Sequence, residues 1–108
     1  MTEVFEELYQ TVLCRKSSKE EGSYTCYLFE KGIDKILKKC GEECTEMVIA
    51  AKNADNNELK NEIADLLYHI MVMCVERELE WGEVEEVLAQ RSNKTGNLKT
   101  IHQVDKNT

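Results

Sequence analysis

Two long stretches of helical periodicity, separated by a short polar segment, constrain the fold of this chain more than any other feature. In the first, from Ile33 to Asn53, apolar residues recur at the three- and four-residue spacing of a helix. The second runs from Glu58 to Glu78, and the chain contains no proline that would interrupt either stretch. Because the segment from Asn53 to Asn57 is short, we expect an antiparallel helical hairpin whose two helices touch along their length.

Shorter helical segments precede the hairpin. Apolar residues from Val4 to Leu13 lie at helical spacing, and the polar run from Arg15 to Gly22 predicts a loop after them. Ser23 is a candidate N-cap for a short helix, which Gly32 interrupts before the first long helix begins.

The chain after the hairpin adds little apolar surface. A break at residues 80–82 leads into a short amphipathic helix to about Arg91, and residues 92–108 are polar, which is typical of a loosely ordered tail. We therefore expect one all-α domain over residues 1–91, a helical bundle built around the hairpin. A chain of 108 residues buries only about 65% of its unfolded surface, so we expect dimerisation to complete the bundle.

The composition excludes several classes of protein. The net charge of −7 argues against a nucleic-acid partner, which would need a basic surface. The longest nearly apolar stretch, residues 63–75, is too short to cross a membrane, and the acidic N-terminus lacks the pattern of a secretory signal. Five cysteines, an odd number without a C-x-x-C pair, indicate reduced thiols, and we therefore expect a cytoplasmic protein.

Two groups of carboxylates in the hairpin do not fit an ordinary exposed helix surface. Glu42, Glu43 and Glu46 lie on adjacent turns of the first long helix, where like charges repel one another. On the second helix Glu62 and Asp65 are three residues apart, and Asp65 lies in the most apolar stretch, where an unpaired carboxylate is unfavourable. Counted from the turn, the two groups reach nearly the same height on facing helices. Their convergence predicts a divalent-cation site, and Mg²⁺ is the natural occupant.

Lysines precede the acids on the first long helix, at positions 31, 35, 38 and 39. They could pair with glutamates one turn later, for instance Lys38 with Glu42 or Lys39 with Glu43. They could instead lie at the rim of a metal site, where their ammonium groups would bind an oligophosphate. Their spacing fits both interpretations.

Other readings of these residues remain open or fit poorly. A di-iron bundle requires Glu-x-x-His motifs, whereas His69 comes four residues after Asp65. Structural zinc requires four nitrogen or sulfur ligands, and no second pair accompanies Cys40 and Cys44. A buried network of salt bridges between the acids and the lysines is the remaining structural alternative.

The pattern of these carboxylates resembles the α-helical nucleoside-triphosphate pyrophosphohydrolases. Their signature is Glu-x-x-Glu on one helix, here Glu43 and Glu46, and Glu-x-x-Asp on the next, here Glu62 and Asp65. Within that group, residues 23–53 and 62–73 are most similar to the phosphoribosyl-ATP pyrophosphohydrolase family.

The resemblance implies an activity and a set of functional residues. The activity is Mg²⁺-dependent hydrolysis of 1-(5-phosphoribosyl)-ATP to 1-(5-phosphoribosyl)-AMP and pyrophosphate, the second step of histidine biosynthesis, with Mn²⁺ as an alternative ion. It also implies a homodimer. The expected metal ligands are Glu43, Glu46, Glu62 and Asp65; the expected catalytic carboxylates are Glu42 and Glu43; and the expected phosphate-binding residues are Lys35, Lys39 and Lys52.

Two other functions are compatible with the sequence. One is a house-cleaning pyrophosphohydrolase that acts on noncanonical or deoxynucleoside triphosphates with the same metal chemistry. The other is a non-catalytic helical dimer that binds a partner through an amphipathic face. Residues near the acids also have ordinary structural explanations: packing for Tyr24, a hydrogen bond in the core for His69, and packing for Trp81.

Overall fold

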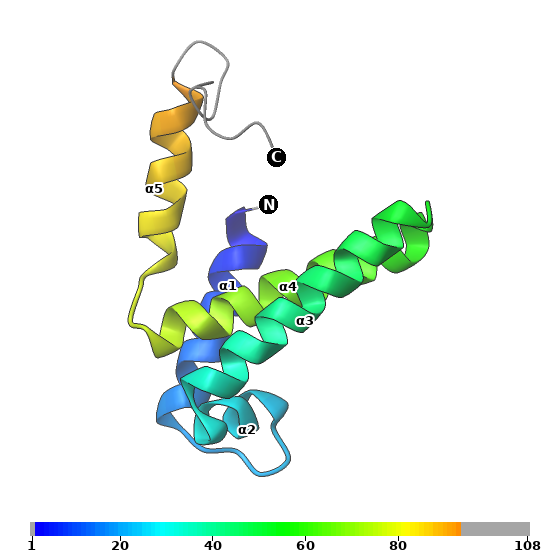
Figure 1. Cartoon of the computed structure of the whole chain (residues 1–108). Coiled ribbons are helices and arrows are strands. Elements are labelled where there is room, and N and C mark those ends of the chain that lie inside the picture. The colour runs from blue at the N-terminus through cyan, green and yellow to red at the C-terminus, as the bar shows by residue number, and fades with distance from the viewer. Residues whose placement is uncertain (1, 94–108) are drawn as a thin grey trace.

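The computed structural model describes residues 2–93, which form five helices and no strand. The helices are α1 (Thr2–Ser17), α2 (Tyr24–Lys31), α3 (Ile33–Lys52), α4 (Asn56–Glu76) and α5 (Trp81–Ser92) (Figure 1). The predicted all-α class is confirmed. Ser92 is the last residue of α5, and residues 94–108 lie outside the described part of the chain. The predicted tail and the domain limits of 1–91 therefore stay predictions.

Helices α3 and α4 lie side by side and run in opposite directions (Figure 1). The turn between them is tighter than the sequence suggested, because α4 begins at Asn56 rather than Glu58. The side chain of Asp55 caps α4 by accepting a 3.0 Å hydrogen bond from the backbone N–H of Glu58. Ala54 has a φ of 56°, so the chain reverses through a left-handed residue.

The N-terminal helices differ from the prediction in one place. Helix α1 continues through Ser17, whereas a loop was expected from Arg15. Its last turn is held to α4 by an ion pair of 2.7 Å between Lys16 and Glu76, a contact that local sequence does not reveal. The predicted cap of α2 is confirmed, since the Ser23 hydroxyl accepts a 3.1 Å hydrogen bond from the backbone N–H of Cys26.

The hydrophobic core occupies one end of the hairpin, where α1 and α2 pack against α3 and α4 (Figure 1). Its largest fully buried side chains are Val12, Leu28, Ile36, Met71 and Val72. The other end of the hairpin extends beyond α1 and α2, and Val48 and Ile49 are more than half exposed there. The acids predicted to form the site therefore lie between a well-packed end and an end that this chain does not cover.

Helix α5 stands apart from the hairpin (Figure 1) and has no buried residue. It is attached through Trp81, whose ring lies 5.9 Å from that of Phe5 on α1, and this contact supports the packing role expected for Trp81. None of the helices in the described range is both long and apolar enough to cross a membrane.

Candidate metal and phosphate site

Three of the predicted carboxylates converge between α3 and α4. One carboxylate oxygen from each of Glu43, Glu62 and Asp65 lies within 4.8 Å of the other two. In an octahedral Mg²⁺ site the metal–oxygen distance is about 2.1 Å, so opposite ligands are about 4.2 Å apart. The three oxygens are thus spaced for a single divalent cation after small side-chain adjustments.

The buried member of this group is Glu43, with only 7% of its surface exposed. The sequence placed Asp65 in an apolar environment, but Asp65 is exposed, because this part of α4 has no covering helix and the neighbouring Ile63 is also exposed. The inference that Asp65 is a buried carboxylate is therefore wrong for the single chain. The cost of desolvation falls mainly on Glu43.

Two oxygens of the cluster are buried without a hydrogen-bond partner, namely Oε2 of Glu43 and Oε2 of Glu62. Buried polar atoms in folded proteins are usually paired, so two unpaired carboxylate oxygens beside a third acid need an explanation. Hard carboxylate oxygens are the ligands that Mg²⁺ and similar cations prefer. The residues present therefore fit a divalent metal ion.

The acids also raise one another's affinity for protons. Burial raises the pKa of Glu43, and the charges of Glu46 and Asp65 raise it further, while His69 and Lys39 partly oppose the change. The pKa of Glu62 is raised mainly by desolvation and then by Glu46, Glu43 and Asp65. Without added positive charge, this cluster is a site of electrostatic repulsion.

Glu46 lies beside the three-acid cluster rather than within it. It is exposed, and together with Glu62 it lines a pocket of about 300 Å³ that extends toward the hairpin turn at Asn53 and Asp55. Its charge acts on both Glu43 and Glu62. The structure therefore places Glu46 at the edge of the acids and next to open space.

Lys39 is the lysine that reaches the acids. Its Nζ lies 3.3 Å from Oε1 of Glu42 and 3.8 Å from Oε1 of Glu43. Within residues 2–93, neither Glu62 nor Asp65 forms an ion pair. One lysine cannot neutralise the whole group, so a network of salt bridges does not account for the cluster.

The other predicted site residues lie farther away. Lys35 and Lys52 are about 12 Å and about 14 Å from Glu43 along the axis of α3, at a rise of about 1.5 Å per residue. Glu42 is next to Glu43 in sequence, but its side chain is exposed and held by Lys39. The structure thus brings Lys39 to the acids and leaves Lys35 and Lys52 at a distance.

A hydrogen-bonded chain links the acids to α2. The Nδ1 atom of His69 is 2.7 Å from the backbone carbonyl of Asp65, and its Nε2 is 3.0 Å from the hydroxyl of Tyr24. Because a carbonyl only accepts, Nδ1 carries the proton, and in the neutral ring Nε2 accepts from Tyr24. The four-residue spacing of Asp65 and His69 was the only sequence signal for this contact, and Tyr24 could not have been predicted as its partner.

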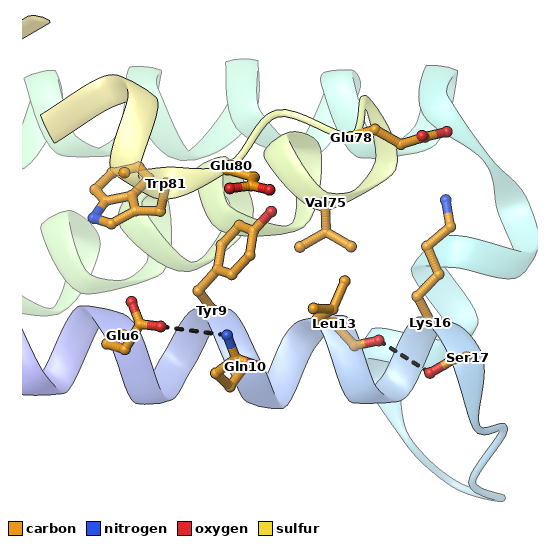
Figure 2. Close-up of a pocket in the computed structure, with 11 residues that line it drawn as sticks. Glu6, Tyr9, Gln10, Leu13, Lys16, Ser17, Val75, Glu78, Glu80 and Trp81 are labelled. Atoms are coloured by element: carbon orange, nitrogen blue, oxygen red, sulfur yellow. Dashed lines mark hydrogen bonds between the residues drawn. The ribbon is translucent and has the colours of Figure 1, made fainter. Parts of the chain in front are cut away.

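A separate pocket of about 690 Å³ lies between α1 and the connection from α4 to α5 (Figure 2). None of the predicted site residues lines it. The hydroxyl of Tyr9, one of its lining residues, donates a 3.0 Å hydrogen bond to the backbone carbonyl of Leu79. This pocket therefore separates the packing of α1 from the chemistry of the hairpin.

Comparison with known proteins gives the same family over almost the whole chain. The profile of the phosphoribosyl-ATP pyrophosphohydrolase family matches residues 5–92. Phosphoribosyl-ATP pyrophosphatase of Streptococcus sanguinis is 55% identical over 94% of this chain and 98% of its own length. The protein of the same name from Clostridium novyi is 50% identical over 90% of this chain and 88% of its own length. The chain belongs to the phosphoribosyl-ATP pyrophosphohydrolase family.

Proposed function

We propose that this protein hydrolyses 1-(5-phosphoribosyl)-ATP to 1-(5-phosphoribosyl)-AMP and pyrophosphate, the second step of histidine biosynthesis. The observation that carries the proposal is the convergence of Glu43, Glu62 and Asp65, with two buried unpaired oxygens, in a member of this family. The relatives named phosphoribosyl-ATP pyrophosphatase support the choice of substrate. Because all five cysteines are free thiols, we assign the reaction to the cytoplasm.

We assign the metal as Mg²⁺, with Mn²⁺ as a substitute, held by Glu43, Glu62 and Asp65, and with Glu46 as a further ligand at the edge. When bound, the ion would supply positive charge that offsets the charge of the substrate triphosphate. The raised pKa values of Glu43 and Glu62 support this assignment, because they report negative charge that lacks a counterion.

The proposed reaction is attack of water on the anhydride between the α and β phosphorus atoms. Glu42, which is exposed and free of the three-acid cluster, is assigned as the acceptor of the proton from water, and Glu43 is the second carboxylate within reach of that proton. The new bond joins the oxygen of water to phosphorus, and the bond to the departing pyrophosphate breaks. Lys39 lies between Glu42 and Glu43, where its ammonium group can stabilise charge on the phosphates.

Lys35 and Lys52 are assigned to the outer parts of the phosphate site. Each sits on α3, on opposite sides of Lys39 and the acids. A flexible four-carbon side chain lets a lysine reach beyond its own turn. Their contribution is therefore expected to be smaller than that of Lys39.

We further propose that the protein is a homodimer. Leu37, Cys44 and Val48 form an exposed stripe on α3 at spacings of seven and four residues, which is the repeat of helices that pack in bundles. Ile63 is 39% exposed on the adjacent α4. A second copy that covers this surface would also bury the uncovered end of the hairpin, next to the proposed metal site.

Release of pyrophosphate tests the proposed substrate. The purified protein is given phosphoribosyl-ATP in Mg²⁺ and, separately, a panel of ordinary, deoxy and noncanonical nucleoside triphosphates. The highest kcat/KM is expected for phosphoribosyl-ATP. A higher kcat/KM for any free triphosphate would contradict the assignment and favour a house-cleaning enzyme.

A further inference from the structure

An aromatic surface lies next to the acids, on α2 and α4. Tyr24 and Tyr27 are one turn apart on α2, and 45% and 40% of their surfaces are exposed. Their ring centroids are 6.1 Å apart, with planes inclined by 26°. Tyr68 of α4 lies behind Tyr24 at 6.2 Å and 29°, so three rings lie in a nearly parallel row.

This surface is held in place rather than free to move. The hydroxyl of Tyr24 donates to the buried His69, and the ring of Tyr24 meets the edge of His69 at 5.8 Å. The hydroxyls of Thr25 and Tyr68 are hydrogen-bonded to each other, which joins α2 to α4 at the same place. An exposed ring with a fixed orientation loses little conformational entropy when a flat partner packs against it.

The surface also lies at a suitable distance from the acids. Tyr68 and His69 follow Asp65 by three and four residues, so they lie about 6 Å farther along the axis of α4. Lys39 approaches from the facing helix, one turn before Glu43, and its charge acts on the Tyr24 hydroxyl. A ligand with phosphates at the acids and Lys39 would therefore extend its remaining part over Tyr24 and Tyr27.

We infer that Tyr24 and Tyr27 bind the adenine ring of the substrate by stacking, with His69 as the residue that positions Tyr24. The inference rests on the proposed function, because it takes the phosphates to lie at the acids. The chemistry favours a purine: stacking on aromatic side chains uses the flat face of the base and is worth about 1–3 kcal/mol per base. Packing alone, the role expected for Tyr24 from sequence, would not leave both rings this exposed.

Equilibrium binding tests this inference independently of catalysis. The probes are 1-(5-phosphoribosyl)-AMP, which carries the base, and inorganic tripolyphosphate, which lacks it, each titrated calorimetrically in Mg²⁺. The variants are Tyr24→Leu and Tyr27→Leu, with Tyr24→Phe and Tyr27→Phe to retain the rings. Val87→Ala, at an exposed position on α5, is the control for a change remote from the acids.

We expect each leucine variant to weaken binding of phosphoribosyl-AMP about fivefold to hundredfold and to leave tripolyphosphate affinity within about twofold. The phenylalanine variants and Val87→Ala should stay within about threefold of the wild type for both probes. Unchanged phosphoribosyl-AMP affinity in both leucine variants would overturn the inference. Equal weakening of both probes, or a change in oligomeric state on substitution of Tyr27, would also overturn it in favour of a structural or interface role.

The same measurements separate this inference from the proposed function. If the wild type fails to release pyrophosphate from phosphoribosyl-ATP, the proposed function fails, whatever the leucine variants do. If the wild type hydrolyses phosphoribosyl-ATP but its KM is unchanged in both leucine variants, the proposed function stands and the stacking surface is wrong.

Discussion

The side chains of Lys39 and Glu43 face each other across one turn of α3, with 3.8 Å between Nζ and Oε1. The other carboxylate oxygen of Glu43 is buried and has no hydrogen-bond partner. The positive charge available within residues 2–93 therefore reaches only one side of Glu43, and the side toward Glu62 and Asp65 remains unbalanced. A divalent cation bound between the three carboxylates would balance that side.

The first prediction is that Mg²⁺ stabilises the fold. An ion that binds only the native state adds about 2.7 kcal/mol at a concentration of about 100 Kd, which raises the melting temperature by several degrees in a domain of this size. Thermal melts at increasing Mg²⁺ should show this rise in the wild type and lose it in Glu43→Gln. The control is Glu20→Gln, in the loop before α2, which should respond to Mg²⁺ as the wild type does.

The second prediction concerns pH in the absence of metal. Because the folded-state pKa of Glu43 is raised, the native state binds more protons than the unfolded state above about pH 4.3. Stability from this group is present at lower pH and is lost as the pH rises through the folded pKa. Urea unfolding in a chelator should therefore show Glu43→Gln gaining free energy of unfolding relative to the wild type between about pH 4 and pH 8.

Comparing the two proteins removes the effect of other groups. The pKa of Glu30 is lowered by its hydrogen bond to Lys19, which contributes stability in the opposite direction as the pH rises. Glu30 is present in both proteins, so its effect cancels in the difference. A difference between wild type and Glu43→Gln that does not change with pH would contradict the raised pKa of Glu43.

The sequence predicted the hairpin and the acids on it, and the reasons are local. The periodicity of α3 and α4 and the short turn at Asn53–Asp55 depend on neighbouring residues alone, and together they bring Glu43 level with Glu62 and Asp65. What failed depends on contacts distant in sequence. Helix α1 is longer than expected where Lys16 meets Glu76, and Asp65 is exposed because α1 and α2 cover only the other end of the hairpin.

The third prediction is that Lys39 contributes to substrate binding more than an ordinary surface lysine does. A hydrogen bond to a charged group is worth about 1.5–3 kcal/mol, so Lys39→Gln should lower kcat/KM for phosphoribosyl-ATP about tenfold or more. Lys19→Gln is the matched control, since Lys19 is also paired with a glutamate, Glu30, but far along the chain from the acids. Equal activities of the two variants would show that Lys39 serves only its glutamate neighbours.

The fourth prediction tests the dimer. Val48 is 57% exposed in the single chain, so Val48→Glu should be harmless to the fold but should place a charge within an apolar interface. Light scattering after gel filtration should give a dimer for the wild type and a monomer for Val48→Glu. Val4→Glu, at an exposed valine on α1, should remain a dimer, and a dimeric Val48→Glu would place the interface elsewhere.

Hydrolysis at the proposed metal site is tested most sharply by pyrophosphate release from phosphoribosyl-ATP, measured for the wild type and for Asp65→Asn in saturating Mg²⁺. Asp65 is exposed, so asparagine leaves the packing intact while it removes one charge from the proposed metal site. We expect hydrolysis by the wild type and a loss of at least about a hundredfold in kcat/KM for Asp65→Asn, with an unchanged helical circular dichroism spectrum. A folded Asp65→Asn variant that hydrolyses phosphoribosyl-ATP at the wild-type rate would contradict a metal-dependent reaction at these carboxylates.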